Sequence, residues 1–120
     1  MARILAVDDA KSICEIIKLV LTQVGHDVTT VLSGREALEL AKTQDFDIIL
    51  CDVNMPEMNG ISLVGKLRLK KGFEYVPIIM VTTEGKDYKK NEARTMGASA
   101  WLQKPFSPEH LIKAVDRFVG

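Results

Sequence analysis

The sequence predicts an open, doubly wound α/β fold, in which a five-stranded parallel sheet carries helices on both faces. Short apolar runs alternate with helical patterns along the whole chain, and this alternation is typical of repeated βαβ units with right-handed crossovers. Most of the apolar runs are continuous instead of alternating with polar residues. Continuous runs indicate strands that are covered on both faces, as in a parallel sheet.

The predicted strands are five apolar runs, at residues 4–7, 27–32, 47–51, 78–81 and 100–102. The run at 27–32, D-V-T-T-V-L, alternates in part between apolar and polar residues. Partial alternation is typical of a strand that is less well covered on one of its faces. We therefore expect this strand nearer an edge of the sheet.

Five helical patterns lie between and after these strands. The first carries an apolar stripe ended by Gly25, and its members are Ile13, Ile16, Ile17, Val20, Leu21 and Val24. A capping box of Ser33 and Glu36 predicts the start of the second helix. The third is expected at about 61–71 and the fourth at about 86–96, and Ser107 with Pro108 opens the last. The fourth is nearly all polar, so we expect it to pack weakly and to be available to a partner.

Length and charge limit the classes of function. The chain has 120 residues, which suits one domain spanning residues 1–120, with no separate output domain. Lys plus Arg and Asp plus Glu both number 16, so no overall field attracts nucleic acid or an anionic membrane. We expect neither as a partner, and we expect the basic cluster of Lys66, Arg68, Lys70 and Lys71 to form a solvated helix face.

The cysteines and the amino terminus indicate a cytoplasmic protein. Cys14 and Cys51 lie in apolar runs without metal-ligand spacing, so we expect free thiols in a reducing compartment. The first apolar run is cut short by Asp8, which is unlike a signal peptide, and no run approaches the length of a transmembrane helix.

Chemically active residues gather where the buried strands end. Asp8 and Asp9 follow the first strand, Asp52 the third, Thr82 and Thr83 the fourth, and Lys104 the fifth. The carboxyl ends of parallel strands meet at one edge of the sheet, where such folds have their functional crevice. Each residue alone has an ordinary explanation, such as a helix N-cap for either of the first two aspartates. Those explanations do not predict the combination.

The combination favours phosphoryl chemistry. Three carboxylates in one crevice need a cation, and hard oxygen ligands suit Mg²⁺ or Mn²⁺. A metal beside a carboxylate, with the Lys104 ammonium and the Thr82 hydroxyl across from it, is an arrangement that stabilises a phosphoryl group in transit. Asp52 is then the nucleophile, because a carboxylate can form an acyl phosphate.

These motifs resemble those of a known family. The Asp8-Asp9 pair, D-V-N-M-P-E-M-N-G at 52–60, V-T-T-E at 81–84 and K-P-F at 104–106 are similar to the receiver domain of bacterial two-component response regulators. The resemblance runs from Arg3 to the final helix. It implies a flavodoxin-like fold and a phosphoryl transfer from a histidine kinase to Asp52.

The resemblance also implies roles for the other site residues. Asp8, Asp9 and Asp52 would hold Mg²⁺, with the backbone carbonyl of Asn54 as the remaining protein ligand. Thr82 and Lys104 would contact the phosphoryl oxygens, and the peptide bond between Lys104 and Pro105 would be cis. Trp101 stands where the family commonly has a tyrosine or phenylalanine that swings inward on activation. The alternative is an indole that stays half-buried on the last strand.

Two features bear on the lifetime of the phosphoryl group, and they act in opposite directions. Asn54 and Glu84 match the polar pair that positions the attacking water in chemotaxis receivers with short-lived signals. Thr83 is bulkier than the residue usual at its position, and it could hinder the water or the phosphoryl donor.

Other classes of function fit less well. A phosphatase with an aspartate nucleophile would want a second acid at position 54, which is asparagine. A flavodoxin-like cofactor binder would offer hydroxyls and amides to a phosphate, where Asp8 and Asp9 would repel it. A phosphohistidine carrier is not supported, because His26 and His110 lie away from the crevice.

Among receivers, the resemblance is to single-domain members of chemotaxis systems. The expected partners are a sensor kinase of the chemotaxis type and a downstream target such as a flagellar motor switch component. A phosphorelay intermediate or a phosphate sink is the alternative. We expect a monomer that catalyses only its own phosphorylation and dephosphorylation.

Overall fold

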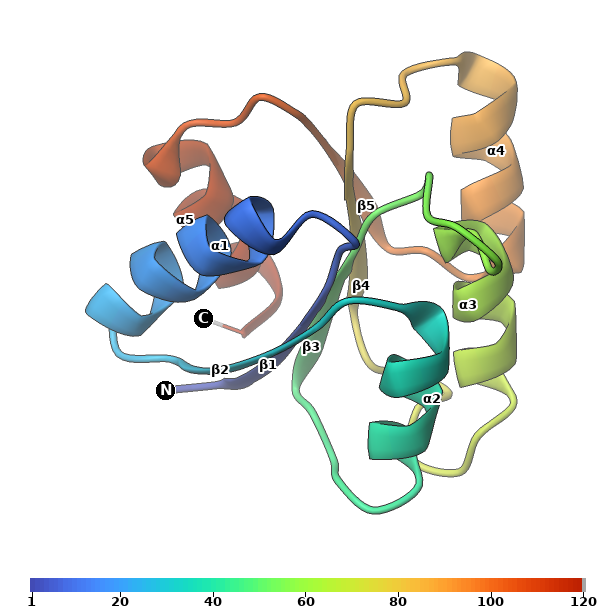
Figure 1. Ribbon diagram of the computed structural model, residues 1–120, viewed down its shortest axis with the longest axis horizontal. Coiled ribbons are helices and arrows are strands. Elements are labelled where there is room, and N and C mark those ends of the chain that lie inside the picture. Colours follow the sequence, from blue (N-terminus) through green and yellow to red (C-terminus); the bar gives the residue numbers. More distant parts are fainter. Residues whose placement is uncertain (120) are drawn as a thin grey trace.

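The computed structural model describes residues 1–119, which form one parallel sheet flanked by helices (Figure 1). Gly120, the last residue of the predicted domain, lies outside the described residues. The strands are β1 (Arg3–Val7), β2 (Asp27–Val31), β3 (Ile48–Cys51), β4 (Ile78–Thr82) and β5 (Ala100–Gln103). The helices are α1 (Lys11–Gln23), α2 (Gly34–Ala41), α3 (Gly60–Arg68), α4 (Asp87–Met96) and α5 (Pro108–Val119).

The sheet confirms the predicted fold class. Its strand order is β2-β1-β3-β4-β5, and every neighbouring pair is parallel. β2 lies at one edge, as its partly alternating sequence predicts, and β5 lies at the other. The chain reverses its direction of winding between β1 and β3, and open α/β sheets form their functional crevice at such a point.

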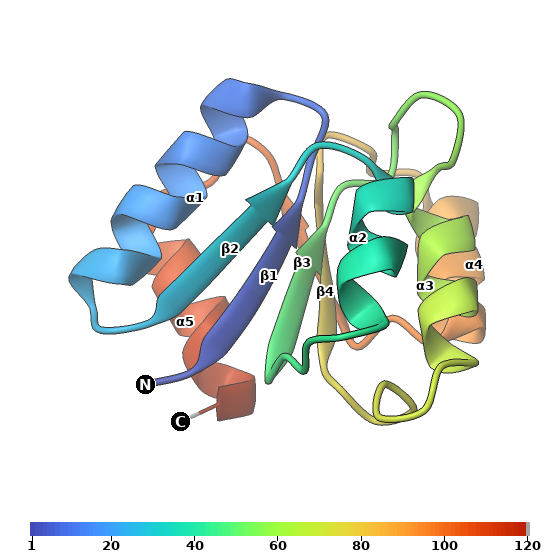
Figure 2. The ribbon, with the colours of Figure 1, turned by 60° about the horizontal axis from the view of Figure 1, so that its bottom comes forward.

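Two apolar cores lie on opposite faces of the sheet. Figure 1 and Figure 2 show α1 and α5 on one face and α2, α3 and α4 on the other. Successive residues of β1 alternate between the cores, with Ile4 and Ala6 in one and Leu5 and Val7 in the other. β1, β3 and β4 are therefore covered on both sides, which explains their continuous apolar sequences.

Several helix boundaries and faces differ from the predictions. Ile16 in α1 and Val24, the residue after α1, are 46% and 47% exposed, because the predicted apolar stripe is wider than the face that packs on the sheet. α3 ends at Arg68 instead of continuing to about Lys71. The predicted cap of α2 is present, since the Ser33 hydroxyl accepts a hydrogen bond from the Glu36 N–H at 3.2 Å.

Arg68, the last residue of α3, is partly buried and does not belong to a solvated face. Its guanidinium donates to the carbonyl oxygens of Phe73 and Val76, at 2.8 and 2.7 Å, and to that of Gly97, at 2.7 Å from Nη2. Gly97 is the left-handed residue that ends α4, with φ 117°. One side chain therefore joins the end of α3, the turn before β4 and the end of α4.

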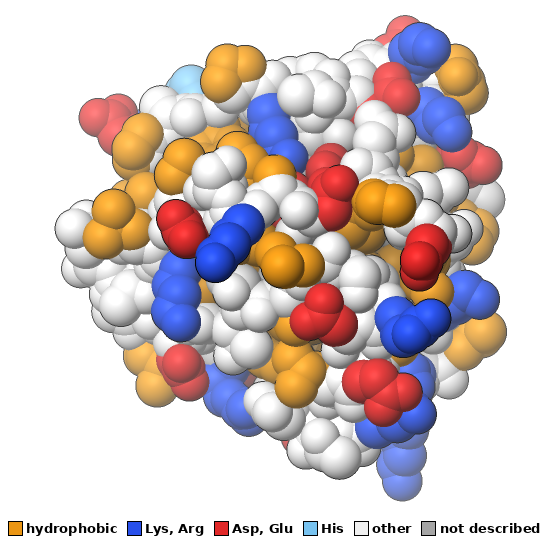
Figure 3. Space-filling model, viewed as in Figure 1, with side chains coloured by type: hydrophobic (Ala, Val, Ile, Leu, Met, Phe, Trp, Pro, Cys, Tyr) orange, Lys and Arg blue, Asp and Glu red, His pale blue; other side chains and the backbone are white. Residues whose placement is uncertain are grey.

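The charges on the surface are mixed, as the equal numbers of acidic and basic residues predict. Figure 3 shows acidic and basic side chains interspersed on the face seen in Figure 1. Among the described residues, no helix is both long enough and apolar enough to cross a membrane. α4 buries Ala93 fully and no other residue, which agrees with its predicted weak packing.

Replacing Arg68 with methionine is expected to lower the free energy of unfolding by about 1–3 kcal/mol, because the apolar stem is kept while the three carbonyls lose their charged donor. Urea denaturation measures the change. Lys71→Met is the matched control, since Lys71 is exposed in the same turn, and it should leave stability within about 0.5 kcal/mol of wild type. Equal effects of the two substitutions would contradict the role given to Arg68.

Candidate functional site

Three aspartates converge at the carboxyl ends of β1 and β3. Asp8 and Asp9 follow β1 and Asp52 follows β3, and these two strands pair directly. Each residue offers a carboxylate oxygen, and the three oxygens lie within 4.8 Å of one another. Asp8 is 2% exposed and Asp52 7%, whereas Asp9 faces solvent. Two of the three charges are therefore held in a crevice that water screens poorly.

Asp8 and Asp9 are not N-caps of the following helix. The N-cap of α1 is Ala10, and it has no side-chain capping bond. Asp8 Oδ1 instead accepts the Ala10 N–H at 2.9 Å, and the Cys14 thiol donates to the Asp8 backbone carbonyl at 3.4 Å. The first bond orients the Asp8 carboxylate, and the second holds the Asp8 backbone at the end of the sheet.

The loop after β3 folds closely around Asp52. Asp52 Oδ1 accepts the Val53 N–H at 2.8 Å, which orients the carboxylate, and the Gly60 N–H donates to the Val53 carbonyl at 2.8 Å. A Cβ atom at Gly60 would lie 1.8 Å from the backbone oxygen of Asp52. Only glycine can therefore occupy position 60 without moving the candidate phosphoacceptor.

Lys104 supplies the positive charge of the site. Its Nζ lies 2.6 Å from Asp8 Oδ2 and 3.4 Å from Asp52 Oδ2, and its side chain is 11% exposed. The backbone places it, because the Lys104 N–H donates to the Thr82 carbonyl at 2.8 Å. The Lys104–Pro105 peptide bond is cis, as the resemblance implies. Burial lowers the pKa of Lys104, but the hydrogen bond to Asp8 and the charges of Asp52 and Asp8 outweigh it and raise the pKa above its ordinary value.

Burial dominates the titration of Asp8. It raises the pKa of the Asp8 carboxyl above the ordinary value of 3.8, although the hydrogen bonds from Lys104 and Ala10 lower it. The folded state therefore binds this proton more readily than the unfolded chain. This contribution to stability is present below pH 3.8 and is lost as the pH rises through the raised pKa.

The acidic cluster fits a hard divalent cation. Three carboxylates facing one ammonium leave an excess of negative charge, and all the available ligand atoms are oxygens. Mg²⁺ prefers such ligands and completes its shell with water, which the exposed position of Asp9 admits. The residues present therefore suit the metal that the sequence predicts.

Thr82, Thr83 and Glu84 lie at the end of β4 and in the loop that follows. Thr82 is fully buried, and its Oγ1 accepts the Glu84 N–H at 3.1 Å. The Glu84 carboxylate turns back on its own loop and accepts the N–H groups of Gly85 and Lys86, at 3.1 and 3.2 Å. Among the described residues no hydrogen bond joins Glu84 to Asn54, which is exposed. Their joint action on an attacking water, which the resemblance implies, stays a prediction.

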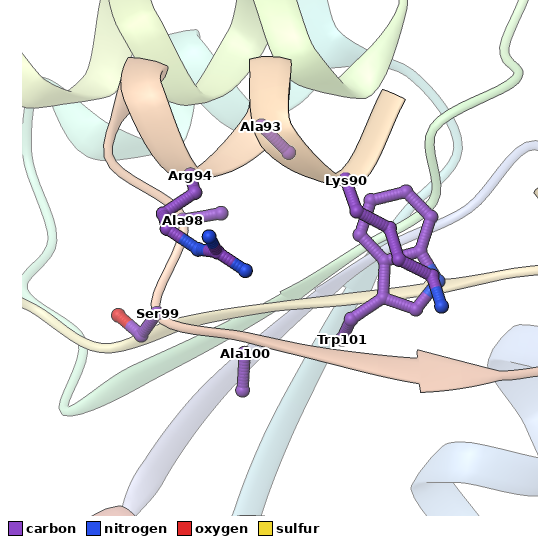
Figure 4. A pocket seen from close by; sticks show the side chains of 7 residues that line it. All are labelled: Lys90, Ala93, Arg94, Ala98, Ser99, Ala100 and Trp101. Carbon is purple, nitrogen blue, oxygen red and sulfur yellow. The ribbon is translucent and has the colours of Figure 1, made fainter. Parts of the chain in front are cut away.

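Trp101 is half-buried at the edge of the sheet. Its Nε1 donates to the Glu84 carbonyl at 3.0 Å, and Lys90 Nζ lies 5.9 Å from the centroid of the indole ring. Figure 4 shows the Lys90 side chain over the indole. Both residues line a hollow of about 120 Å³ between α4 and β5. The ring is therefore tied to the loop that begins at Thr83.

Gln103 is a site neighbour that the sequence analysis did not single out. Its Nε2 donates to the Thr83 carbonyl at 2.7 Å. The available signal was its position, because it ends β5 opposite Thr82 in the register and precedes Lys104. A polar side chain at this position can bond to the backbone at the end of the neighbouring strand β4. Only the path of the loop after β4 shows that the Thr83 carbonyl is the acceptor.

The chain belongs to the response regulator receiver domain family, whose model matches residues 4–116. The Chemotaxis protein CheY homolog of Campylobacter jejuni is 42% identical over 120 residues, which cover 98% of this chain and 92% of that protein. The structure of chemotaxis protein CheY4 of Vibrio cholerae is similar with a TM-score of 0.95 and 44% identity, covering 98% of both chains.

A solved relative bears on the metal. The receiver domain of a sensor histidine kinase from Pseudomonas aeruginosa is similar with a TM-score of 0.91 and 29% identity, covering 99% of this chain and 98% of that one. It was solved with a magnesium ion coordinated in its active site cleft.

Lys104 and a bound metal are expected to compete for the same carboxylates. Replacing Lys104 with methionine should therefore raise the affinity for Mg²⁺ by about tenfold and lower the thermal stability of the metal-free protein. Asp9→Ala removes a ligand without removing the ammonium, and it should largely abolish the thermal shift caused by Mg²⁺. Thermal denaturation over a MgCl₂ titration measures both effects.

Lys113→Met is the control, because Lys113 is exposed on α5, and it should titrate like wild type. An Mg²⁺ affinity of Lys104→Met equal to that of wild type would contradict the competition. An unchanged thermal shift in Asp9→Ala would contradict the metal site.

Proposed function

We propose that the protein is a phosphoacceptor that takes a phosphoryl group from a histidine kinase onto Asp52 in a Mg²⁺-dependent reaction. The observation that carries the proposal is the buried Asp52 carboxylate between two further acids and the Lys104 ammonium, which lies 3.4 Å from Asp52 Oδ2. A carboxylate in such surroundings is oriented for attack and has a cation beside it to stabilise the charge of the transferred group.

The chain's own residues would perform the transfer as follows. The Asp52 Oδ1 bond to the Val53 N–H holds the carboxylate, and Oδ2, which faces Lys104, attacks phosphorus as the bond from phosphorus to the donor imidazole breaks. Mg²⁺ held by Asp8, Asp9, Asp52 and the Asn54 carbonyl would supply positive charge to the phosphoryl oxygens. Lys104 stays protonated throughout and transfers its contact from Asp8 to a phosphoryl oxygen.

The proposal includes a switch that starts at Thr82. An aspartyl phosphate brings negative charge and new acceptor oxygens to the crevice. The Thr82 hydroxyl can donate to one of them, and the loop bonded to it continues into α4. Trp101 is bonded to the same loop, so a change at Thr82 reaches the surface formed by α4 and β5. The lifetime of the signal then depends on Asn54, Glu84 and Thr83.

For the physiological role we propose chemotaxis signalling. Relatives named as chemotaxis proteins match nearly the full length of this chain, which supports a chemotaxis sensor kinase as the donor and a motor switch component as the target. A phosphorelay intermediate or phosphate sink is the second candidate. In either role the protein would act as a cytoplasmic monomer without a substrate other than its own phosphoryl group, and Asn54 in place of an acid argues against an aspartate-nucleophile phosphatase.

Asp52→Asn is expected to abolish phosphorylation, because the amide cannot form the acyl phosphate. Incubation with Mg²⁺ and acetyl phosphate, followed by mass spectrometry, should show one added phosphoryl group on wild type that is labile to base. Asp116→Asn on the exposed side of α5 is the control and should label fully. Labelling of Asp52→Asn to the wild-type extent would contradict the assignment.

Charge reversal of Lys89 and Lys90 is expected to weaken target binding by about tenfold while phosphorylation stays intact, since both lie on the weakly buried α4 and Lys90 covers Trp101. Binding of the beryllofluoride complex to the target measures the first effect, and acetyl phosphate labelling the second. Lys71→Glu, in the exposed turn after α3, should change neither. Equal loss of target binding and of phosphorylation in the α4 variant would indicate a folding defect. That result would contradict the proposal that α4 contacts the target.

A further inference from the structure

The loop between β4 and α4, residues 83–86, is tied to β5 at two points. Trp101 Nε1 donates to the Glu84 carbonyl at 3.0 Å, and Gln103 Nε2 donates to the Thr83 carbonyl at 2.7 Å. Side chains two residues apart on a strand project from the same face. Two side chains on one face of β5 thus donate hydrogen bonds to two consecutive carbonyls of the loop, those of Thr83 and Glu84.

The loop is shaped to receive the Gln103 amide. A Cβ atom at Gly85 would lie 3.1 Å from both Nε2 and Oε1 of Gln103, so the amide group lies directly against the glycine. The register sets Gln103 opposite Thr82, which brings the amide to the start of the loop. The Thr83 carbonyl can only accept, so the bond requires the NH₂ group of the amide.

The bond from Gln103 to the loop also restricts the position of the Thr82 hydroxyl. The N–H of Glu84 belongs to the peptide whose carbonyl Gln103 binds, and this N–H donates to Thr82 Oγ1 at 3.1 Å. A hydroxyl has one hydrogen and two lone pairs. With one lone pair occupied by the Glu84 N–H, the hydroxyl hydrogen is left to donate to another acceptor. The Thr83–Glu84 peptide therefore lies between the Gln103 amide and the switch hydroxyl, bonded to both.

We propose that Gln103 is a positioning residue for the phosphoryl site. By fixing the Thr83–Glu84 peptide it presets the Thr82 hydroxyl as a donor to the phosphoryl group on Asp52, and Trp101 provides the second point of the same clamp. The positioning role rests on the phosphoacceptor function proposed above. The clamp, which is the pair of bonds from Trp101 and Gln103 to the loop, does not depend on that function. Loss of one such hydrogen bond should weaken binding of a phosphoryl analogue by about threefold to tenfold.

Gln103→Met tests the role, because it keeps an unbranched side chain of similar length and removes the donor without adding charge. Its affinity for beryllofluoride in the presence of Mg²⁺, followed by Trp101 fluorescence or calorimetry, should fall about threefold to tenfold. The decisive comparison is made in a Thr82→Ala background, where no hydroxyl remains to be positioned. There Gln103→Met should cause no further loss, and an equal loss in both backgrounds would overturn the positioning role.

Hydrogen exchange of the free protein tests the clamp without any phosphoryl analogue. The Glu84 amide should exchange about threefold to tenfold faster in Gln103→Met, while the amide of Asp52, bonded to the Val7 carbonyl within the sheet, should not change. Unaltered exchange at Glu84 would overturn the clamp. A wild-type protein that binds no beryllofluoride would contradict the phosphoacceptor function and the positioning role with it, whereas the exchange result would still decide the clamp.

Discussion

The mutual repulsion of three carboxylates is the constraint on which the arrangement of this protein depends. Two of them, Asp8 and Asp52, are almost fully buried at the ends of adjacent central strands, where repulsion is stronger than in water. β1 and β3 are packed on both faces, so the acids cannot move apart without disturbing both cores. The Lys104 ammonium, 2.6 Å from Asp8, offsets part of the repulsion, and the remainder favours a cation.

Much of the fold and of this site could be predicted because both follow from short-range patterns. Continuous apolar runs identify β1, β3 and β4, and parallel strands bring their terminal residues together, so the approach of Asp8, Asp9 and Asp52 follows from the topology. What escaped prediction depends on contacts distant in sequence. Arg68 joins the end of α3 to the Gly97 carbonyl, and Gln103 bonds to a loop whose path no local pattern specifies.

The same long-range contacts explain how a polar helix keeps its place. α4 buries only Ala93 fully, so packing alone holds it weakly. Its carboxyl end is fixed where Arg68 donates to Gly97. Its amino end follows the loop that Trp101 and Gln103 bind, in which the Glu84 carboxylate accepts the Lys86 N–H. Hydrogen bonds thus hold both ends of the helix, and only the amino end is connected to Thr82.

Because only its amino end is connected to Thr82, α4 would tilt about its carboxyl end, near Gly97, when the proposed switch moves the loop. Ten residues of helix span about 15 Å, so a displacement of about 2 Å at the amino end tilts the axis by about 8°. Such a displacement would diminish along the helix, so residues near Lys89 would move farther than those near Arg94. A protein that contacts the first turns of α4 would therefore discriminate between the two states more sharply than one that contacts its last turn.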